Sequence, residues 1–250
     1  MDARLVLAGL FWLSAAAQAF DHGSWDALLK KHVVVLEAGK ASQLRYAGMA
    51  DDRVALKKYL AGLGNVSEAE FKSWSRAEQM AFLINAYNAF AVEKILTRYP
   101  DIRSIWDFGK IFGNPFKDEF FTLLGRKMSL DGIEHGLLRK NYREPRVHYA
   151  LNCASVGCPM LREEAYVAAR LERQLEEQAV RFLSDRSRNR YRDGRLEVSK
   201  IFDWFKEDFE PRQAYFARYA SALGYPGAEA PLSFLDYDWS LNDFRSSSRR

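Results

Sequence analysis

The chain has 250 residues, of which 48% are hydrophobic and 28% charged, proportions typical of a globular protein and not of a disordered chain. The formal net charge is only +4, and part of this excess comes from Arg245, Arg249 and Arg250 at the C-terminus. No basic run lies inside the chain, so we expect no nucleic-acid partner.

The N-terminus has the pattern of a secretory signal peptide. Arg4 precedes an apolar run over residues 5–13, and small residues follow as far as the cleavage pattern Ala17-x-Ala19. The run is too short to cross a bilayer, and no later stretch approaches the roughly 20 apolar residues of a membrane helix. We therefore expect a signal peptide over residues 1–19, no transmembrane span in the mature chain, and a periplasmic or secreted location.

An uncleaved anchor stays open as an alternative, because Asp2 stands close to the lone Arg4 of the positive region. The mature chain should begin near Phe20. Because no internal repeat or long linker divides it, we expect a single globular domain over residues 20–243 and a flexible basic tail over 244–250.

Apolar residues at helical spacing dominate the first part of the mature chain. They predict amphipathic helices over residues 25–36 and 51–63, the second closed by Gly64. Ser75 and Glu78 form a capping box ahead of the longest periodic run, which predicts a central helix.

A hairpin and a short helix are predicted next. Extended, apolar sequence over residues 120–128 surrounds Gly125-Arg126, a pattern typical of a tight turn. Asp131 and Glu134 then predict the capped start of a short helix.

Pro145 precedes the best candidate for a buried central strand, over residues 146–153. In a regular strand, His148 and Cys153 would point to opposite faces. A bulge could bring Cys153 back, and Cys158 lies beyond the strand in a turn, where it is freer.

The last third alternates between helices and strands. The predicted elements are a charged helix over residues 167–183, a strand over 195–199 and helices over 202–209 and 211–223, with Pro211 at the first helical position. The aromatic segment 234–242 should pack back on the domain. The fold class is therefore α+β, a helix-rich single domain around a small, mainly antiparallel sheet, for which a permuted papain-like arrangement is one candidate.

Reactive side chains are concentrated over residues 134–158, where both cysteines and two of the four histidines lie. A cysteine nucleophile needs a base, a group that orients the base and donors for an oxyanion. His148 is the candidate base, with Glu134 or Asn85 to orient it. The candidate catalytic residues are Asn85, Glu134, His135, His148, Cys153 and Cys158.

A structural interpretation competes with the catalytic one. In an oxidising compartment, Cys153 and Cys158 would most simply form a disulfide, and closing so small a loop contributes only about 2 kcal/mol. His135 and Asn85 equally fit buried structural roles. A zinc site built from both histidines and both cysteines would lack the close paired spacing of common sites, so neither a metal nor another cofactor is expected.

Five blocks of sequence carry a resemblance to a known family. They are residues 82–89, 133–139, 145–153 with Cys158-Pro159, 199–205 with Asp208-Phe209, and 237–242. With these blocks the chain resembles the family catalogued as domain of unknown function 547.

The resemblance implies little about activity. Relatives include exported bacterial proteins, plant proteins with a coiled coil, and animal proteins that join the domain to a glutaredoxin-like one, which hints at thiol chemistry by analogy alone. Relatives of the plant type resemble this segment with Ser at the position of Cys158, which puts a required disulfide in doubt and favours Cys153.

Two functions stay open. One is a thiol-dependent hydrolase or acyl transferase acting on a peptide or a small amide or thioester. The other is a noncatalytic periplasmic binding module for a small-molecule or peptide ligand, with a structural disulfide. The sequence indicates no oligomeric state.

Overall fold

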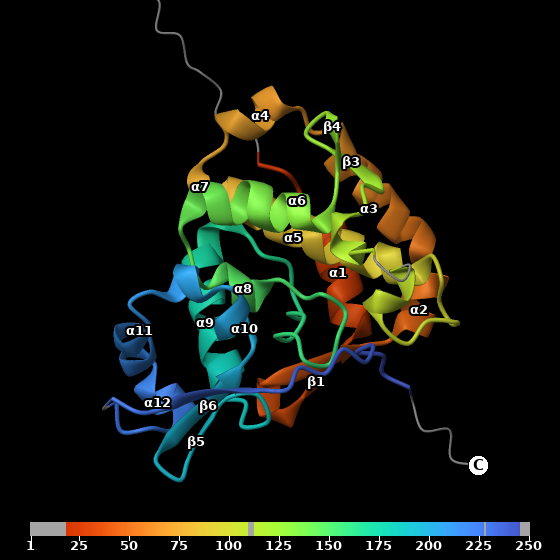
Figure 1. The fold of residues 1–250 in the computed structure, drawn as a ribbon. Helices are drawn as coiled ribbons and strands as arrows, with labels where there is room; N and C mark the ends of the chain where they lie inside the picture. The colour runs from red at the N-terminus through yellow and green to blue at the C-terminus, as the bar shows by residue number, and fades with distance from the viewer. Residues whose placement is uncertain (1–18, 110–112, 228, 246–250) are drawn as a thin grey trace, which may run out of the picture.

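The computed structural model describes residues 19–109, 113–227 and 229–245 (Figure 1). The predicted signal peptide lies outside the described residues, apart from Ala19, and so does the predicted tail beyond Arg245. Within these ranges, no helix has both the length and the hydropathy needed to span a bilayer.

The N-terminal part contains helices around one hairpin. Its elements are α1 (Gly23–His32), β1 (Val33–Leu36), the short helix η1 (Glu37–Gly39), β2 (Ala41–Leu44), α2 (Tyr46–Asp51), α3 (Arg53–Asn65) and α4 (Glu68–Ser73). The predicted helix over residues 25–36 is wrong at its end, where β1 pairs antiparallel with β2. Consecutive valines occupy β1, and β-branched side chains favour the extended backbone.

Helix α3 runs past its predicted end. Gly64 lies inside the helix instead of closing it, and Val66 is the C-cap. A Cβ at Gly64 would stand 3.2 Å from the carbonyl oxygen of Thr122, so the missing side chain lets α3 approach the neighbouring hairpin closely.

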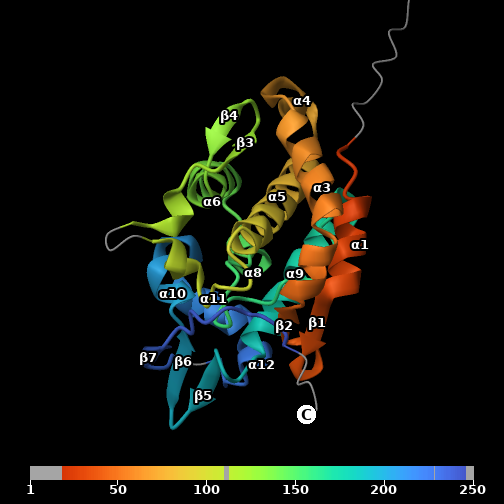
Figure 2. The ribbon, with the colours of Figure 1, turned by 90° about the vertical axis from the view of Figure 1, so that its right-hand side faces the viewer.

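The longest helix, α5 (Arg76–Leu96), forms the centre of the larger hydrophobic core. Its predicted capping box is confirmed: the Glu78 amide donates to the Ser75 hydroxyl at 3.3 Å, and the Ser75 amide donates to the Glu78 carboxylate at 2.7 Å. Figure 2 shows α5 between α3 on one side and α6 (Leu130–Ile133) on the other. Polar side chains on so buried a helix require hydrogen-bond partners in neighbouring segments.

The predicted hairpin is confirmed as β3 (Phe121–Leu123) and β4 (Arg126–Met128). Its turn is Leu124-Gly125, one residue earlier than predicted, and both residues have positive φ, as the tight turn requires.

The helix after the hairpin begins at the N-cap Ser129, whose hydroxyl accepts from the Gly132 amide, and not at Asp131. It continues through a π-helical segment, η4 (Glu134–Arg139), into α7 (Lys140–Tyr142). Such π-turns occur frequently at functional sites.

Residues 146–153 do not form the predicted buried strand. They form one helical turn, α8 (Val147–Ala150), followed by an irregular segment. Periodicity alone cannot separate a short apolar strand from a buried helical turn, and none of the described strands pairs with this segment. Instead α8 packs against α9 (Leu171–Leu183), where the Gln178 side chain donates to the Tyr149 carbonyl at 3.3 Å. The predicted alternation of His148 and Cys153 across a strand therefore does not apply.

The last third follows the prediction more closely. Its elements after α9 are β5 (Arg190–Arg192), β6 (Arg195–Ser199), α10 (Ile201–Trp204), η6 (Lys206–Phe209), α11 (Arg212–Arg218), α12 (Ala220–Leu223) and β7 (Leu232–Leu235). Three short helices lie earlier in the chain: η2 (Ile105–Phe108), η3 (Pro115–Lys117) and η5 (Ala168–Arg170). Two predicted helices are each divided, at Phe205 and at Tyr219. Pro211 is the N-cap of α11 and not its first residue.

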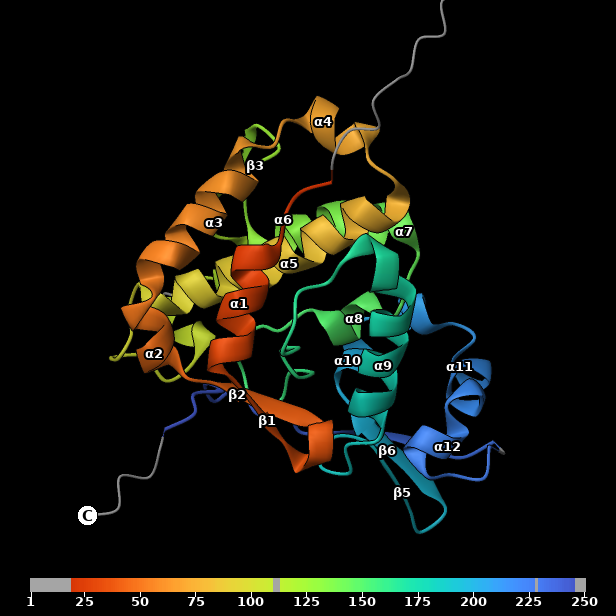
Figure 3. The same ribbon diagram turned by 180° about the vertical axis from the view of Figure 1, so that it is seen from behind.

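Strands β5, β6 and β7 form one small sheet, in which β6 pairs antiparallel with β5 and parallel with β7. Figure 3 shows this sheet, with α11 and α12, at the opposite end of the molecule from α4 and the β3–β4 hairpin. The predicted helix-rich α+β class is confirmed, whereas the permuted papain-like arrangement is not.

The C-terminal segment packs back on the rest of the chain, as predicted. The Asn242 amide donates to the Ala154 carbonyl at 3.1 Å, the Leu44 amide donates to the Asn242 carbonyl at 2.9 Å, and the Phe244 amide donates to the Leu44 carbonyl at 2.9 Å. This segment ties the β1–β2 hairpin to the loop that follows α8.

Candidate functional site

One cavity of about 580 Å³ brings together most of the predicted site residues. It lies between η4, α8 with the loop that follows, α10 and the C-terminal segment. The predicted residues that line it are Glu134, His135, His148, Cys153 and Cys158, whereas Asn85 does not.

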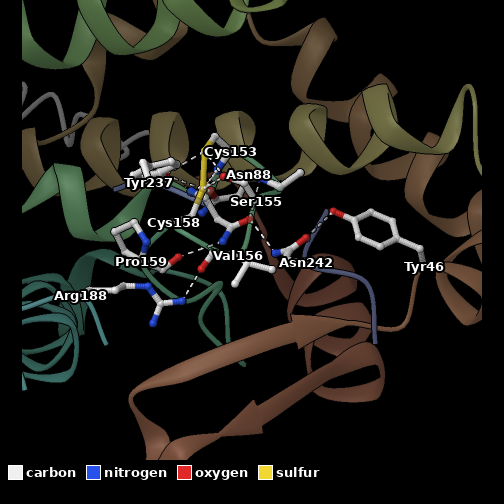
Figure 4. The surroundings of a disulfide bond; sticks show 12 residues. Tyr46, Asn88, Cys153, Ser155, Val156, Cys158, Pro159, Arg188, Tyr237 and Asn242 are labelled. Atoms are coloured by element: carbon white, nitrogen blue, oxygen red, sulfur yellow. Dashed lines mark hydrogen bonds between the residues drawn. A yellow bond between two sulfur atoms is a disulfide. The ribbon is translucent and has the colours of Figure 1, made fainter. Parts of the chain in front are cut away.

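Cys153 and Cys158 form a disulfide in the wall of this cavity (Figure 4). The Ser155 hydroxyl lies 3.1 Å from each sulfur, and the Tyr237 hydroxyl lies 3.4 Å from Cys153 Sγ and 3.3 Å from Cys158 Sγ. Burial raises the pKa of Tyr237, so its hydroxyl stays protonated and can donate to sulfur. Cys158 is buried and Cys153 is half-buried, so Cys153 is the more exposed of the two cysteines.

Buried amide side chains fix the loop that carries the disulfide. Asn152 donates to the Pro159 carbonyl at 2.9 Å and accepts from the Ala154 amide at 3.0 Å and from Asn242 at 3.2 Å. From α5, Asn88 donates to the Ala150 carbonyl at 2.9 Å and accepts from the Asn152 amide at 2.8 Å. The loop is therefore anchored independently of its disulfide.

Gly157 allows the C-terminal segment to cover this loop. Its amide donates to the Asp238 carbonyl at 2.8 Å. An added Cβ would meet the Tyr237 ring at 2.9 Å and the Asp238 backbone at 3.0 Å, so only glycine allows this approach without displacing the segment.

His148 lies between two carboxylates. Its Nε2 is 2.7 Å from Asp208 and its Nδ1 is 3.5 Å from Glu134, and the side chain is 1% exposed. Burial alone would lower the pKa of His148, but the hydrogen bonds to Asp208 and Glu134 outweigh it and raise the pKa. The two carboxylates therefore favour the imidazolium form of His148 and occupy both of its ring nitrogens.

Asp208 belongs to the site although it is not among the residues predicted from the sequence. It lies in η6 and pairs with Arg139 as well as with His148. Burial opposes its ionisation, yet the hydrogen bonds from His148 and Arg139 hold the pKa of Asp208 well below its usual range. The sequence does contain an indication of this role, because Asp208-Phe209 is part of one of the blocks that carry the family resemblance.

His135 has different partners from His148. Its Nδ1 lies 2.6 Å from Nη1 of Arg139, and its Nε2 lies 3.6 Å from Asp131. A guanidinium can only donate hydrogen bonds, so in this contact the Nδ1 of His135 is the acceptor. Both imidazoles and the Arg139 guanidinium lie against the Phe205 ring, whose centroid is 4.0 Å from that of His148.

Asn85 does not orient His148. Its amide donates to the Tyr166 carbonyl at 2.8 Å and accepts from the Tyr166 amide at 3.0 Å, with the side chain fully buried. It pins an extended segment onto α5, which corrects its predicted place beside the base.

The predicted pair of a thiol and an imidazole is not assembled in this structure. Among the described residues, no hydrogen bond joins either histidine of the site to either sulfur, since the histidines bind carboxylates and Arg139 instead. The disulfide also removes both thiolates as metal ligands, and no group of three or more His, Cys, Asp or Glu in the described ranges could hold a metal ion.

Aromatic rings form the rest of the cavity lining. We define the aromatic wall as Trp106, Phe116, Trp204, Tyr237 and Trp239, and the ionic wall as Asp131, Glu134, His135 and His148. Trp239 is central to the aromatic wall, with ring centroids 5.3 Å from Trp106, 5.6 Å from Trp204 and 4.6 Å from Tyr237. Trp204 and Trp106 remain 44% and 39% exposed, which leaves ring surface free for a ligand.

Comparison with known proteins finds a family match over part of the chain. The family model described as protein of unknown function, DUF547, matches residues 71–183. This segment is therefore similar to that family. The resemblance seen in the sequence is thereby confirmed over the DUF547 segment, which carries the ionic wall and the disulfide loop. Asp208 and three residues of the aromatic wall lie beyond it. No significant match was found among the curated proteins or among the solved structures.

Proposed function

We propose that this protein is an exported ligand-binding module, in which the cavity holds a small organic molecule and the disulfide is structural. The observation that carries the proposal is the cavity itself, about 580 Å³ in volume and lined by both the aromatic wall and the ionic wall. Ligand sites in proteins commonly have volumes of about 300–1,000 Å³, with apolar linings and a few fixed polar groups.

The contacts around the polar groups favour binding over catalysis. His148 has no free nitrogen to accept a proton from a nucleophile, because both face carboxylates. The sulfurs are joined to each other and surrounded by hydroxyl groups. Fixed groups of this kind orient a ligand without needing to react with it.

The disulfide also supports export. Disulfides persist in oxidising compartments such as the bacterial periplasm and are rare in the cytosol. Together with the signal pattern that ends at Ala17-x-Ala19, this favours a periplasmic or secreted location.

Benzyl alcohol, a neutral aromatic probe, should bind the native protein saturably in isothermal titration calorimetry. Replacing Trp204 by Ala should weaken this binding about tenfold, because an aromatic contact contributes about 0.5–1.5 kcal/mol beyond the area that it buries. Val180→Ala is the matched control, since Val180 has the same 44% exposure but does not line the cavity. An absence of saturable binding, or equal affinities for Trp204→Ala and Val180→Ala, would contradict the proposal.

A second candidate is a thiol-dependent hydrolase or acyl transferase acting on a peptide or a small amide or thioester. One observation favours it: both cysteines line the cavity, and Cys153 is half-buried whereas Cys158 is buried. Reduction of the disulfide by a low-molecular-weight thiol would present Cys153 to a bound substrate. The Ser155 and Tyr237 hydroxyls could then donate to its thiolate.

A further inference from the structure

We propose that the ligand of this cavity is an organic cation, a compound with an alkylated ammonium group. This inference rests on the proposed binding function and names the chemistry that the cavity selects. It follows from the charge of the ionic wall, from the exposed faces of the aromatic wall, and from the position of both on one cavity.

The ionic wall and its supporting pairs carry an unbalanced negative charge. Glu134 and Asp208 are balanced by His148 and Arg139, with which they form ion pairs. Asp131 has His135 beside it, at 3.6 Å, and its side chain is 31% exposed; the other ring nitrogen of this histidine faces Arg139. Among the described residues, no lysine or arginine forms an ion pair with this carboxylate at the cavity surface.

The described part of the lining supplies no lysine or arginine to balance Asp131. Arg188 lies behind the disulfide loop, where it pairs with Asp185 and contacts the Val156 carbonyl. A ligand with a positive charge would complete the site electrostatically, whereas an anion would be repelled.

The aromatic wall suits the same ligand. The faces of aromatic rings carry partial negative charge and attract cations, most strongly for tryptophan, and recognition of quaternary ammonium groups by several rings is a recurrent use of this effect. Trp204, Trp239 and Tyr237 lie mutually within 5.6 Å between ring centroids. Bulky alkyl groups on the ammonium would bury against these rings while the charge faces Asp131 and Glu134.

Choline and its uncharged carbon isostere, in which a tert-butyl group replaces trimethylammonium, separate charge recognition from apolar burial. Choline should bind the native protein about tenfold more tightly than the isostere in calorimetry, because only choline can form cation–π contacts with the rings of the aromatic wall. Comparing a short peptide that contains one trimethyl-lysine with choline shows whether the alkylated ammonium group belongs to a protein side chain or to a free small molecule. Tighter binding of the peptide points to a modified protein side chain, tighter binding of choline points to a free small molecule, and either result supports a cation site.

Asp131→Asn should weaken choline binding about fivefold and leave the isostere unaffected, because it removes charge without changing shape. Asp193→Asn is the matched control, a carboxylate that is 88% exposed in the β5–β6 turn and does not line the cavity. Thermal unfolding of each variant verifies that it is folded.

Equal binding of choline and the isostere would overturn the cation inference but leave the binding function standing. If neither ligand binds while benzyl alcohol does, the cation inference also falls, and if benzyl alcohol fails as well, both proposals fall.

Discussion

Replacing Asp208 by Asn should lower the free energy of unfolding by about 2–3 kcal/mol. The change leaves the Arg139 guanidinium and the buried His148 without the carboxylate that both bind. Breaking a fully buried ion pair costs about 3–5 kcal/mol. The loss here should be smaller, because the Asp208 side chain is 25% exposed and solvent screens its charge. Chemical denaturation at neutral pH measures this loss.

The same variant should change the dependence of stability on pH. The pKa of His148 is raised in the folded state, so its contribution is fully present below its unfolded value of about 6.5 and is lost as pH rises through the folded value. The pKa of Asp208 is lowered, so its contribution is present above about 3.9 and is lost only in strong acid. The native protein should therefore lose stability as pH rises above about 6.5, and Asp208→Asn should lose less over that range.

Asp203→Asn serves as the control, because Asp203 lies in the neighbouring α10 but is exposed. We expect it to retain both the stability and the pH dependence of the native protein. If Asp208→Asn behaved like Asp203→Asn, His148 would not be held by this carboxylate.

Asn152→Ala should cost about 3 kcal/mol of unfolding free energy. The side chain joins Pro159, Ala154 and Asn242, so its removal leaves buried backbone and amide groups without partners. Each buried polar group left unpaired costs about 1–3 kcal/mol, with partial relief where water can enter. The loss is measured by denaturant unfolding with the disulfide intact.

Asn141→Ala is a suitable comparison, since Asn141 is exposed in α7. Its effect should stay within about 0.5 kcal/mol, as for most surface changes. A comparably small effect of Asn152→Ala would mean that the disulfide, and not the amide network, holds the loop.

The elements that the sequence predicts well are those with strong local signals. The capping box of Ser75 and Glu78 and the long amphipathic pattern of α9 depend on neighbours in the chain, and both are confirmed. The segment over residues 146–153 fails because its apolar run fits either a buried strand or a buried helical turn. Packing against α5 and α9, which no local pattern reveals, decides for the turn.

The site is predicted in part for a similar reason. Glu134, His135, His148 and the cysteines are close in sequence, and the fold brings all of them to one cavity. Asp208 comes from a segment 60 residues after His148, and only the tertiary structure shows that it takes the position assigned to Asn85. The tautomer of His135 also depends on Arg139, which carried no chemical signal in the sequence.

The aromatic wall shows the same limit. The sequence pattern around Trp204, Tyr237 and Trp239 does not distinguish core residues from ligand contacts, because aromatic residues in a globular domain are usually buried. The structure places them on the cavity, with Trp204 44% exposed.

The rate of iodoacetamide labelling against pH, on the native protein with and without a mild reductant, tests the central claim most directly. That claim is a closed disulfide in a binding cavity with no thiolate available. We expect no labelling of the unreduced protein at any pH, and after reduction the same labelling curve for the native protein and for His148→Gln, because His148 binds carboxylates and not sulfur. Fast labelling of the unreduced native protein below neutral pH, abolished in His148→Gln, would contradict the claim and favour the thiol-dependent enzyme instead.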